Sequence, residues 1–224
     1  MKNFGKEIFV FFIFLLCGLV VFASGVKDED INSKNDIPSF CCNVSIDYPV
    51  FETEPVLNSF LKNNVAEIYT NFNKTVILDL ERTGNCELII KAGNVHKEND
   101  YISFILSAYE YNAGAAHGLT SLIPVNYNTK TKKIVSLEEV LNPNSKDWLV
   151  KLSEEARKQL MEQNKKGLLS SDNEWIKKGT EPIVSNFKNF EIEKNNIKIV
   201  FDSYQVAPYS SGMPEIKIPL DFFN

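Results

Sequence analysis

The chain opens with an uncharged run of apolar residues at 8–23. Lys2 and Lys6 precede this run, and polar residues follow it from Ser24 onward. This order is typical of a secretory signal peptide. As a helix the run would rise about 24 Å, short of the roughly 30 Å hydrocarbon core of a bilayer. We therefore expect a cleaved signal peptide at 1–23, with membrane contact only through this segment where it stays uncleaved.

A flexible polar leader at 24–37 precedes the first patterned region. Residues 40–51 mix β-branched and aromatic side chains and contain Pro49, which predicts a strand near a sheet edge. The period then changes to steps of three and four residues, with Pro55 in the first turn. This spacing predicts an amphipathic helix whose apolar stripe packs on a sheet. The stripe consists of Val56, Leu57, Phe60, Leu61, Val65, Ile68, Tyr69 and Phe72.

Apolar residues alternate with polar ones in three successive segments, 86–95, 101–111 and 119–127. Alternation of this kind predicts half-buried strands. The breaks between the segments are short, which favours antiparallel pairing. Residues 128–133 form the next predicted turn.

Helical spacing returns after this turn. Ser136 and Glu139 have the spacing of a capping box for a short helix at 137–141. Asn144 or Ser145 is the expected cap of a longer helix. Its inner face consists of Trp148, Leu149, Leu152, Ala156 and Leu160. A polar loop and a brief helix beginning at Thr180 and Pro182 follow.

The C-terminal part again favours strands. Residues 189–201 predict a hairpin that turns at Asn195 and Asn196, and residues 213–220 predict a last strand. The order of elements predicts an α+β fold with antiparallel sheets packed against a few helices, rather than a parallel βαβ winding.

Composition narrows the function. The chain has 224 residues, 44% hydrophobic and 24% charged, which suits one compact domain or two small ones that share a core. A formal net charge of -5 provides no basic field for nucleic acid. Local signatures of a nucleophile elbow, a phosphate loop, an H-E-x-x-H helix and a dinucleotide fingerprint are absent from the sequence. We therefore expect no nucleic acid, no dinucleotide, no other cofactor and no catalytic residue of these types.

The cysteines permit one disulfide in an exported protein. Removal of the signal peptide leaves Cys41, Cys42 and Cys86, an odd number. Adjacent residues on a strand point to opposite faces, so only one of the first two can meet Cys86. A bridge from Cys86 to Cys41 or to Cys42 and buried reduced thiols stay open as alternatives. Because the spacing of a zinc site is missing, no structural metal is expected.

Two motifs carry a resemblance to a known family. They are "YEYNAGAAHGLT" at 109–120 and the segment "FDSYQVAPYSSG" at 201–212. With the "YPVF" segment and the following helix, they resemble the extracytoplasmic module of PdaC-type polysaccharide deacetylases and RsiV-type anti-sigma factors. The family usually has a glycine at the position of Ala115. The resemblance implies an α+β fold of two associated parts, 38–112 and 113–224.

The resemblance also implies a function. In PdaC-type proteins the module precedes a separate metal-dependent deacetylase domain, and in RsiV-type proteins a cytoplasmic segment holds the sigma factor. We expect neither activity from this sequence. The outer module of RsiV-type proteins captures lysozyme. By analogy we expect an exported, extracellular, periplasmic or envelope-associated, non-catalytic module that binds a lysozyme-like protein, peptidoglycan or another cell-wall glycan.

Six residues of the two motifs are the candidate binding site. His117 is either a base or ligand beside Asp202, or a structural histidine whose ring is held by a backbone carbonyl near Gly114 and Gly118. The tyrosines suit carbohydrate or protein contact where they are exposed. The full set is Tyr109, Tyr111, His117, Asp202, Tyr204 and Tyr209.

Two other functions stay open. Paired carboxylates could make the protein a glycan hydrolase, and the distance between them would decide this. An exposed sheet edge could make it a structural protein that dimerises in the envelope.

Overall fold

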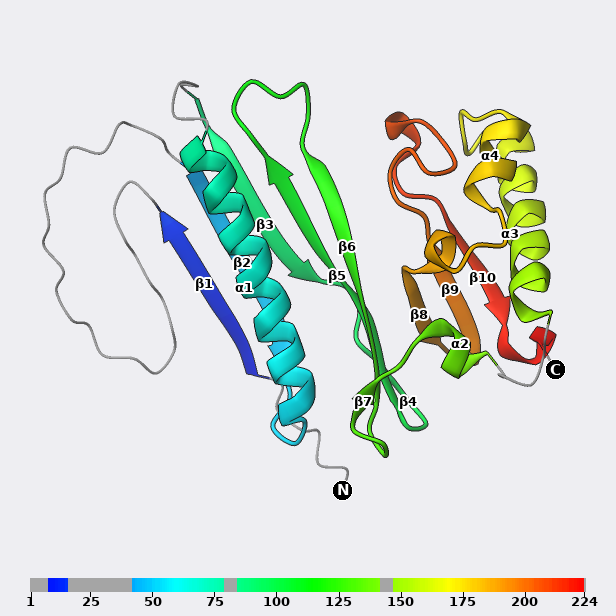
Figure 1. Cartoon of the computed structure of the whole chain (residues 1–224), viewed down its shortest axis with the longest axis horizontal. Helices are drawn as coiled ribbons and strands as arrows, with labels where there is room; N and C mark the ends of the chain where they lie inside the picture. Colours follow the sequence, from blue (N-terminus) through cyan, green and yellow to red (C-terminus); the bar gives the residue numbers. More distant parts are fainter. Residues whose placement is uncertain (1–7, 16–41, 79–83, 142–146, 224) are drawn as a thin grey trace, which may run out of the picture. The chain divides into compact units, whose positions relative to one another are not determined.

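The computed structural model describes residues 8–15, 42–78, 84–141 and 147–223, and these residues divide into two compact units (Figure 1). Unit 1 contains a long helix and part of a seven-stranded sheet, and unit 2 contains several helices, the rest of that sheet and a three-stranded sheet, so the predicted α+β class is confirmed. The segments of unit 1 lie within Met1–Ala92 and Leu106–Ser121, and those of unit 2 within Gly93–Ile105 and Leu122–Asn224.

Each unit draws on two separate stretches of chain, whereas the sequence suggests a single boundary after Asn112. The physical reason is that two long strands contribute to both units. Strand β5 (Tyr101–Tyr111) begins in unit 2 and ends in unit 1, and β6 (Leu119–Asn128) begins in unit 1 and ends in unit 2. The short strands β4 (His96–Glu98) and β7 (Lys133–Ile134) pair with the unit 2 ends of β5 and β6.

Unit 1 is built around a βαβ segment, formed by β2 (Cys42–Val50), α1 (Pro55–Leu78) and β3 (Cys86–Ala92). Strands β2 and β3 pair in parallel, unlike the antiparallel pair that β3 makes with β5. The 24-residue helix carries the chain back along the sheet, so that β3 starts at the same end as β2. This parallel pair is the one departure from the expected strand directions in the described part of unit 1.

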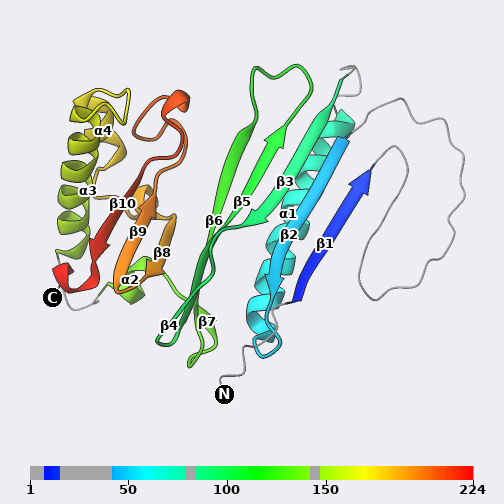
Figure 2. The same cartoon turned by 180° about the vertical axis from the view of Figure 1, so that it is seen from behind.

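Helix α1 covers one face of the unit 1 sheet, and Figure 2 shows the opposite face without a helix of this unit on it. The buried side chains of β2 and β3 alternate with exposed ones, as the sequence pattern predicts. None of the described helices is both long and apolar enough to cross a membrane. The core of unit 1 includes Val44, Ile46, Leu57, Leu61, Phe72, Leu88 and Ile90.

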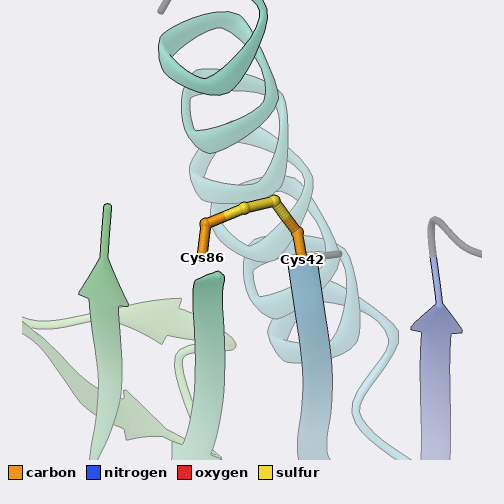
Figure 3. The surroundings of a disulfide bond; sticks show 2 residues. All are labelled: Cys42 and Cys86. Carbon is orange, nitrogen blue, oxygen red and sulfur yellow. A yellow bond between two sulfur atoms is a disulfide. The ribbon is translucent and has the colours of Figure 1, made fainter. Parts of the chain in front are cut away.

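The disulfide joins Cys42 to Cys86 (Figure 3). These residues are directly paired at the start of β2 and β3, with a Cα–Cα distance of 4.4 Å. Both side chains are buried. Cys41, the other candidate, lies outside the described residues. The bridge links the two ends of the βαβ segment across a sequence separation of 44.

Strand β1 (Ile8–Leu15) falls within the predicted signal peptide. It pairs antiparallel with β2, from Ile8 against Val50 to Leu15 against Asn43. Cleavage after residue 23, which stays a prediction, would remove β1 and leave β2 as the edge strand of this sheet.

Unit 2 places α3 (Trp148–Lys165) on a three-stranded antiparallel sheet. The strands lie in the order β10 (Glu215–Pro219), β9 (Asn196–Val200) and β8 (Phe190–Glu193). Alternate residues of these strands join the inner face of α3 in one core. That core contains Trp148, Leu152, Ala156, Leu160, Phe190, Ile192, Ile197, Ile199, Ile216 and Ile218.

Side chains of β5 and β6 form hydrogen bonds with backbone groups at the outer edge of β8. The Ile192 N–H donates to Ser103 Oγ at 2.6 Å, and Asn126 Nδ2 donates to the Phe190 carbonyl at 2.9 Å. Ser103 Oγ in turn donates to Asn126 Oδ1 at 2.7 Å. A strand edge otherwise offers unpaired backbone groups to other chains, so this network closes the edge.

Glu191 on β8 and Lys198 on β9 form an ion pair in which the carboxylate is buried and the lysine is partly exposed. The Glu191 carboxylate accepts the Ile105 N–H at 2.8 Å and lies 2.5 Å from Lys198 Nζ, with only 4% of its side chain exposed. Burial alone would lower the pKa of Lys198, but its hydrogen bond and attraction to Glu191 outweigh burial, so the pKa is raised. Lys198 therefore stays charged beside the Glu191 carboxylate.

The local structure of unit 2 confirms one helix start and corrects others. Helix α2 (Leu137–Val140) begins at Ser136 with the predicted capping box. The expected caps of α3, Asn144 and Ser145, lie outside the described residues. The predicted polar loop instead contains α4 (Asn173–Gly179), whose first turn is capped by Asp172.

The brief helix expected at Thr180 is wrong, because this residue ends α4 and its N–H is already bonded to carbonyls of that helix. The next helical turn is η1 (Val184–Phe187). The β8–β9 hairpin turns at Lys194 and Asn195, both with positive φ, one position before the prediction. The final turns are η2 (Tyr209–Ser211) and η3 (Leu220–Phe223).

Candidate functional site

The six candidate residues form two groups, one in each unit. Tyr109, Tyr111 and His117 belong to unit 1, and Asp202, Tyr204 and Tyr209 belong to unit 2. The structure brings residues together within each group. Their roles in binding stay a prediction.

The unit 1 group lies at the end of β5 and in the turn that follows. Tyr109 pairs with Ile89 and Tyr111 pairs with Glu87, so both tyrosines lie on the sheet face opposite the buried Leu88. A Cβ atom on Gly118 would overlap the Tyr109 ring. The Tyr109 ring therefore lies against the Gly118 backbone, which covers one side of the ring, and a side chain at this position would displace the ring.

His117 is held locally. Its Nδ1 lies 2.9 Å from the Gly118 carbonyl oxygen, which accepts a hydrogen bond from the ring when Nδ1 carries the proton. The geometry corresponds to the structural alternative, in which a backbone carbonyl orients the imidazole. Among the described residues, no group of three or more His, Cys, Asp or Glu side chains is placed to hold a metal ion.

Sequence reasoning missed one ionisable residue of unit 1. Glu110 lies between the two tyrosines on β5 and pairs with Leu88. Its side chain therefore faces the side of the sheet that packs on α1, and burial raises the pKa of its carboxyl. Strand alternation could have predicted this inward carboxyl, because the neighbouring tyrosines point outward.

The unit 2 group lies on the loop between β9 and β10, and Asp202 fastens the start of this loop. Its Oδ1 accepts a hydrogen bond from Asn189 Nδ2 at 2.8 Å, and its Oδ2 lies 3.0 Å from Lys188 Nζ. Its N–H donates to Gln205 Oε1 at 3.1 Å. These bonds occupy the Asp202 carboxylate in positioning the loop.

Tyr204 and Tyr209 form an aromatic pair on this loop, with ring centroids 5.8 Å apart and an interplanar angle of 31°. Tyr204 has a φ of +68°, a conformation that is uncommon for a residue with a large side chain. The residue as a whole is 47% exposed to solvent. The strained backbone thus presents a large aromatic ring to solvent, next to a second ring.

Two residues outside the predicted set hold this pair in place. The indole Nε1 of Trp175 donates to the Tyr204 carbonyl at 3.0 Å. Gln205 Nε2 donates to the carbonyls of Gly179 and Asn186, at 3.0 and 2.8 Å. A Cβ atom on Gly179 would overlap the Gln205 carbonyl oxygen, so α4 and the loop approach as closely as glycine permits. The helical cap at Asp172 is the signal that could have revealed α4 and with it Trp175.

Comparison with known protein families matches one part of the chain. Residues 138–221 match the family described as "Protein of unknown function (DUF3298)". This segment is similar to DUF3298 domains. It contains the Tyr204–Tyr209 pair, Asp202 and Trp175, whereas the unit 1 group lies outside it.

A longer relative confirms the resemblance to PdaC-type proteins. The chain is 32% identical over 186 residues to "Peptidoglycan-N-acetylmuramic acid deacetylase PdaC" of Bacillus subtilis (strain 168). The match covers 82% of this chain but only 38% of that protein. The activity of the relative therefore belongs to a protein of which this chain spans less than half.

Two solved structures share the fold. A DUF3298 family protein from Pseudomonas aeruginosa PAO1 matches with a TM-score of 0.64 and 21% identity, over 97% of this chain and 90% of that one. A member of the family from Bacteroides fragilis NCTC 9343 matches with a TM-score of 0.55 and 18% identity, over 98% and 93%. At these identities the likeness concerns the fold alone, that is, the arrangement of helices and strands.

Proposed function

We propose that this protein is an exported, non-catalytic module of the cell envelope that binds the glycan strands of peptidoglycan through Tyr204 and Tyr209. The observation that supports it best is the aromatic pair within the segment that matches DUF3298, in which Tyr204 is exposed and Tyr209 is partly exposed. Aromatic rings offer a large apolar face to the C–H faces of sugars, while the phenol hydroxyls bond to sugar oxygens. The similarity to PdaC, whose name refers to peptidoglycan, supports the choice of polymer.

The way the pair is held also favours binding. The Trp175 and Gln205 hydrogen bonds fix the loop before any ligand arrives. A ligand then does not have to order the loop, which lowers the entropic cost of association. By contrast, the Tyr109 ring in unit 1 is covered on one side by Gly118. We therefore place the glycan contact in unit 2.

The test is co-sedimentation of the purified protein with insoluble peptidoglycan. The Tyr204→Ala/Tyr209→Ala variant removes both rings and is expected to weaken retention at least tenfold. The Tyr204→Phe/Tyr209→Phe variant keeps the ring faces and is expected to retain most of the binding. Tyr111→Ala is the matched control, because it removes a partly exposed tyrosine of unit 1.

The outcomes separate the possible partners. Retention that survives loss of both unit 2 tyrosines, or that is lost in Tyr111→Ala, contradicts the proposal. Retention on immobilised lysozyme with none on peptidoglycan assigns the pair to a protein partner instead. Release of reducing sugar from the polymer would support the hydrolase alternative, and a dimer in sedimentation velocity would support the structural one.

A further inference from the structure

Unit 2 contains a cavity of about 600 Å³, and its lining includes no residue of the tyrosine loop. It is formed by α2, the β8–β9 turn and the segment from the end of β10 through η3. Its volume falls within the range of small-molecule sites in proteins. The lining consists of Glu139, Val140, Leu141, Lys194, Asn195, Asn196, Pro219, Leu220, Asp221 and Phe223.

The apolar wall of the cavity is part of the unit 2 core. Leu141 and Phe223 are each 1% exposed, and Val140 and Leu220 pack against the same core with part of their surface outside it. Aliphatic groups of a ligand can therefore lie against Val140 and Leu220. Because the core fixes these residues, the wall exists before a ligand binds.

Hydrogen bonds fix the polar rim. The Leu220 N–H donates to the Asn195 carbonyl at 2.8 Å, which ties η3 to the hairpin turn. Asn196 Nδ2 donates to the Lys194 carbonyl at 2.8 Å. The rim is thus held by the turn itself, whose residues Lys194 and Asn195 adopt positive φ.

The charge of the cavity favours a cation. Two of its lining residues are acidic, Glu139 and Asp221, and one is basic, Lys194. One oxygen of the Glu139 carboxylate accepts the Ser136 N–H at 2.7 Å, and the hydrogen bonds with Ser136 lower the pKa of this carboxyl. Within the described segments, neither Asp221 nor Lys194 forms an ion pair with another residue of the chain.

We propose that this cavity binds the primary ammonium group of a short organic ligand, with the carboxylates of Asp221 and Glu139 facing the ammonium and Val140 and Leu220 contacting the adjoining carbon chain. Two envelope compounds share this chemistry, a peptide with a lysine-like side chain and an amino sugar without its acetyl group. The choice of envelope compounds rests on the location given in the proposed function, whereas the site itself does not depend on glycan binding by the tyrosines.

The experiment is calorimetric titration of the Tyr204→Ala/Tyr209→Ala variant, in which the aromatic pair cannot contribute. The probes are N-terminally acetylated Ala-Gln-Lys-Ala and the trimer of glucosamine, each compared with its fully N-acetylated counterpart. We expect at least one free amine to bind about tenfold more tightly than its acetylated form, because acetylation removes the charge.

The decisive substitution is Glu139→Gln/Asp221→Asn in the same background. Glutamine also completes a capping box, so α2 keeps its first turn while both charges are lost. We expect amine binding to weaken about tenfold with an unchanged melting temperature. Where the melting temperature falls, Asp221→Asn alone replaces the double variant. Glu181→Gln, which neutralises an exposed residue elsewhere in unit 2, is the matched control and should change nothing.

Each possible result either supports or overturns the proposed ammonium site. Preference for the peptide amine or for the sugar amine supports the site and identifies the source of the ammonium. Equal binding of free and acetylated probes, an equal loss in Glu181→Gln, or no saturable binding of either amine overturns it. Failure here leaves the peptidoglycan test with intact tyrosines unaffected.

Discussion

Units 1 and 2 both pack a long helix against a sheet, but they are stabilised in different ways. Unit 1 closes its βαβ segment with the Cys42–Cys86 disulfide. Unit 2 has no disulfide among its described residues and instead contains the Glu191–Lys198 pair and the Ser103–Asn126 network. A covalent link acts mainly on the unfolded chain, whereas a buried polar network acts only when every partner is in place. The two units should therefore respond to different perturbations.

The largest expected effect is loss of the disulfide. A loop of 44 residues between the bridged cysteines predicts a stabilisation of about 4 kcal/mol from chain entropy. The Cys42→Ser/Cys86→Ser variant should lose this amount in urea unfolding, and hydrogen exchange should become faster in β2 and β3. Wild-type protein treated with dithiothreitol is the control and should match the variant. A loss below about 1 kcal/mol would contradict the contribution assigned to the bridge.

The next effect concerns the Glu191–Lys198 pair of unit 2. Lys198→Met leaves the Glu191 carboxylate buried without its cation, which should cost about 3 kcal/mol of unfolding free energy. Glu191→Gln/Lys198→Met should recover most of this, because an amide oxygen can still accept the Ile105 N–H. Lys217→Met is the matched control, since its partner Glu193 is more exposed, and it should cost less than about 1 kcal/mol. Equal losses for the two lysine variants would show that burial does not matter here.

Two glycine substitutions compare the tyrosine groups directly. Gly179→Ala should displace the Gln205 backbone carbonyl at a cost of about 2 kcal/mol, whereas Gly118→Ala should displace only the end of the Tyr109 side chain, at a cost of about 1 kcal/mol. Thermal unfolding measures both costs. Only Gly179→Ala is expected to weaken retention on peptidoglycan as well, because it disturbs the loop that carries Tyr204 and Tyr209. If only Gly118→Ala weakened retention, the result would indicate that the binding surface lies in unit 1.

The smallest effect is a pH dependence in unit 2. The hydrogen bond from Lys217 lowers the pKa of Glu193 below its ordinary value. The folded pKa is then lower than the unfolded one, so the stabilisation is complete above the unfolded pKa and is lost as the pH falls through the folded pKa. The difference in unfolding free energy between wild type and Glu193→Gln should be below about 1 kcal/mol at pH 7 and should shrink in acid. The Cys42–Cys86 contribution should not change over the same range.

Periodic side-chain patterns predict most of the fold. The alternation in 101–111 and the helical spacing after Pro55 locate β5 and α1, because each depends on a face that must be buried. The parallel pairing of β2 with β3 does not follow from alternation, since either direction buries the same side chains. Helix α4 is only seven residues long, too short for a clear period.

The candidate site is less predictable than the fold. The motif at 201–212 identifies Tyr204 and Tyr209, but no pattern in the sequence indicates that a tyrosine adopts a positive φ. The Trp175 contact depends on α4 and so was missed with it. The Lys188–Asp202 ion pair and the Asn189 hydrogen bond depend on how η1 leads into β8, which propensity alone does not specify.

The division of β5 between the two units bears on how this protein can be dissected. The match to DUF3298 begins at residue 138. The residues that bond to the edge of β8, Ser103 and Asn126, lie before this boundary. So does Ile105, whose N–H donates to the Glu191 carboxylate. A fragment cut at the family boundary would expose a bare strand edge and an acidic group lacking its amide donor. A fragment that folds stably when it is expressed alone must therefore start well before residue 138, where the family match begins.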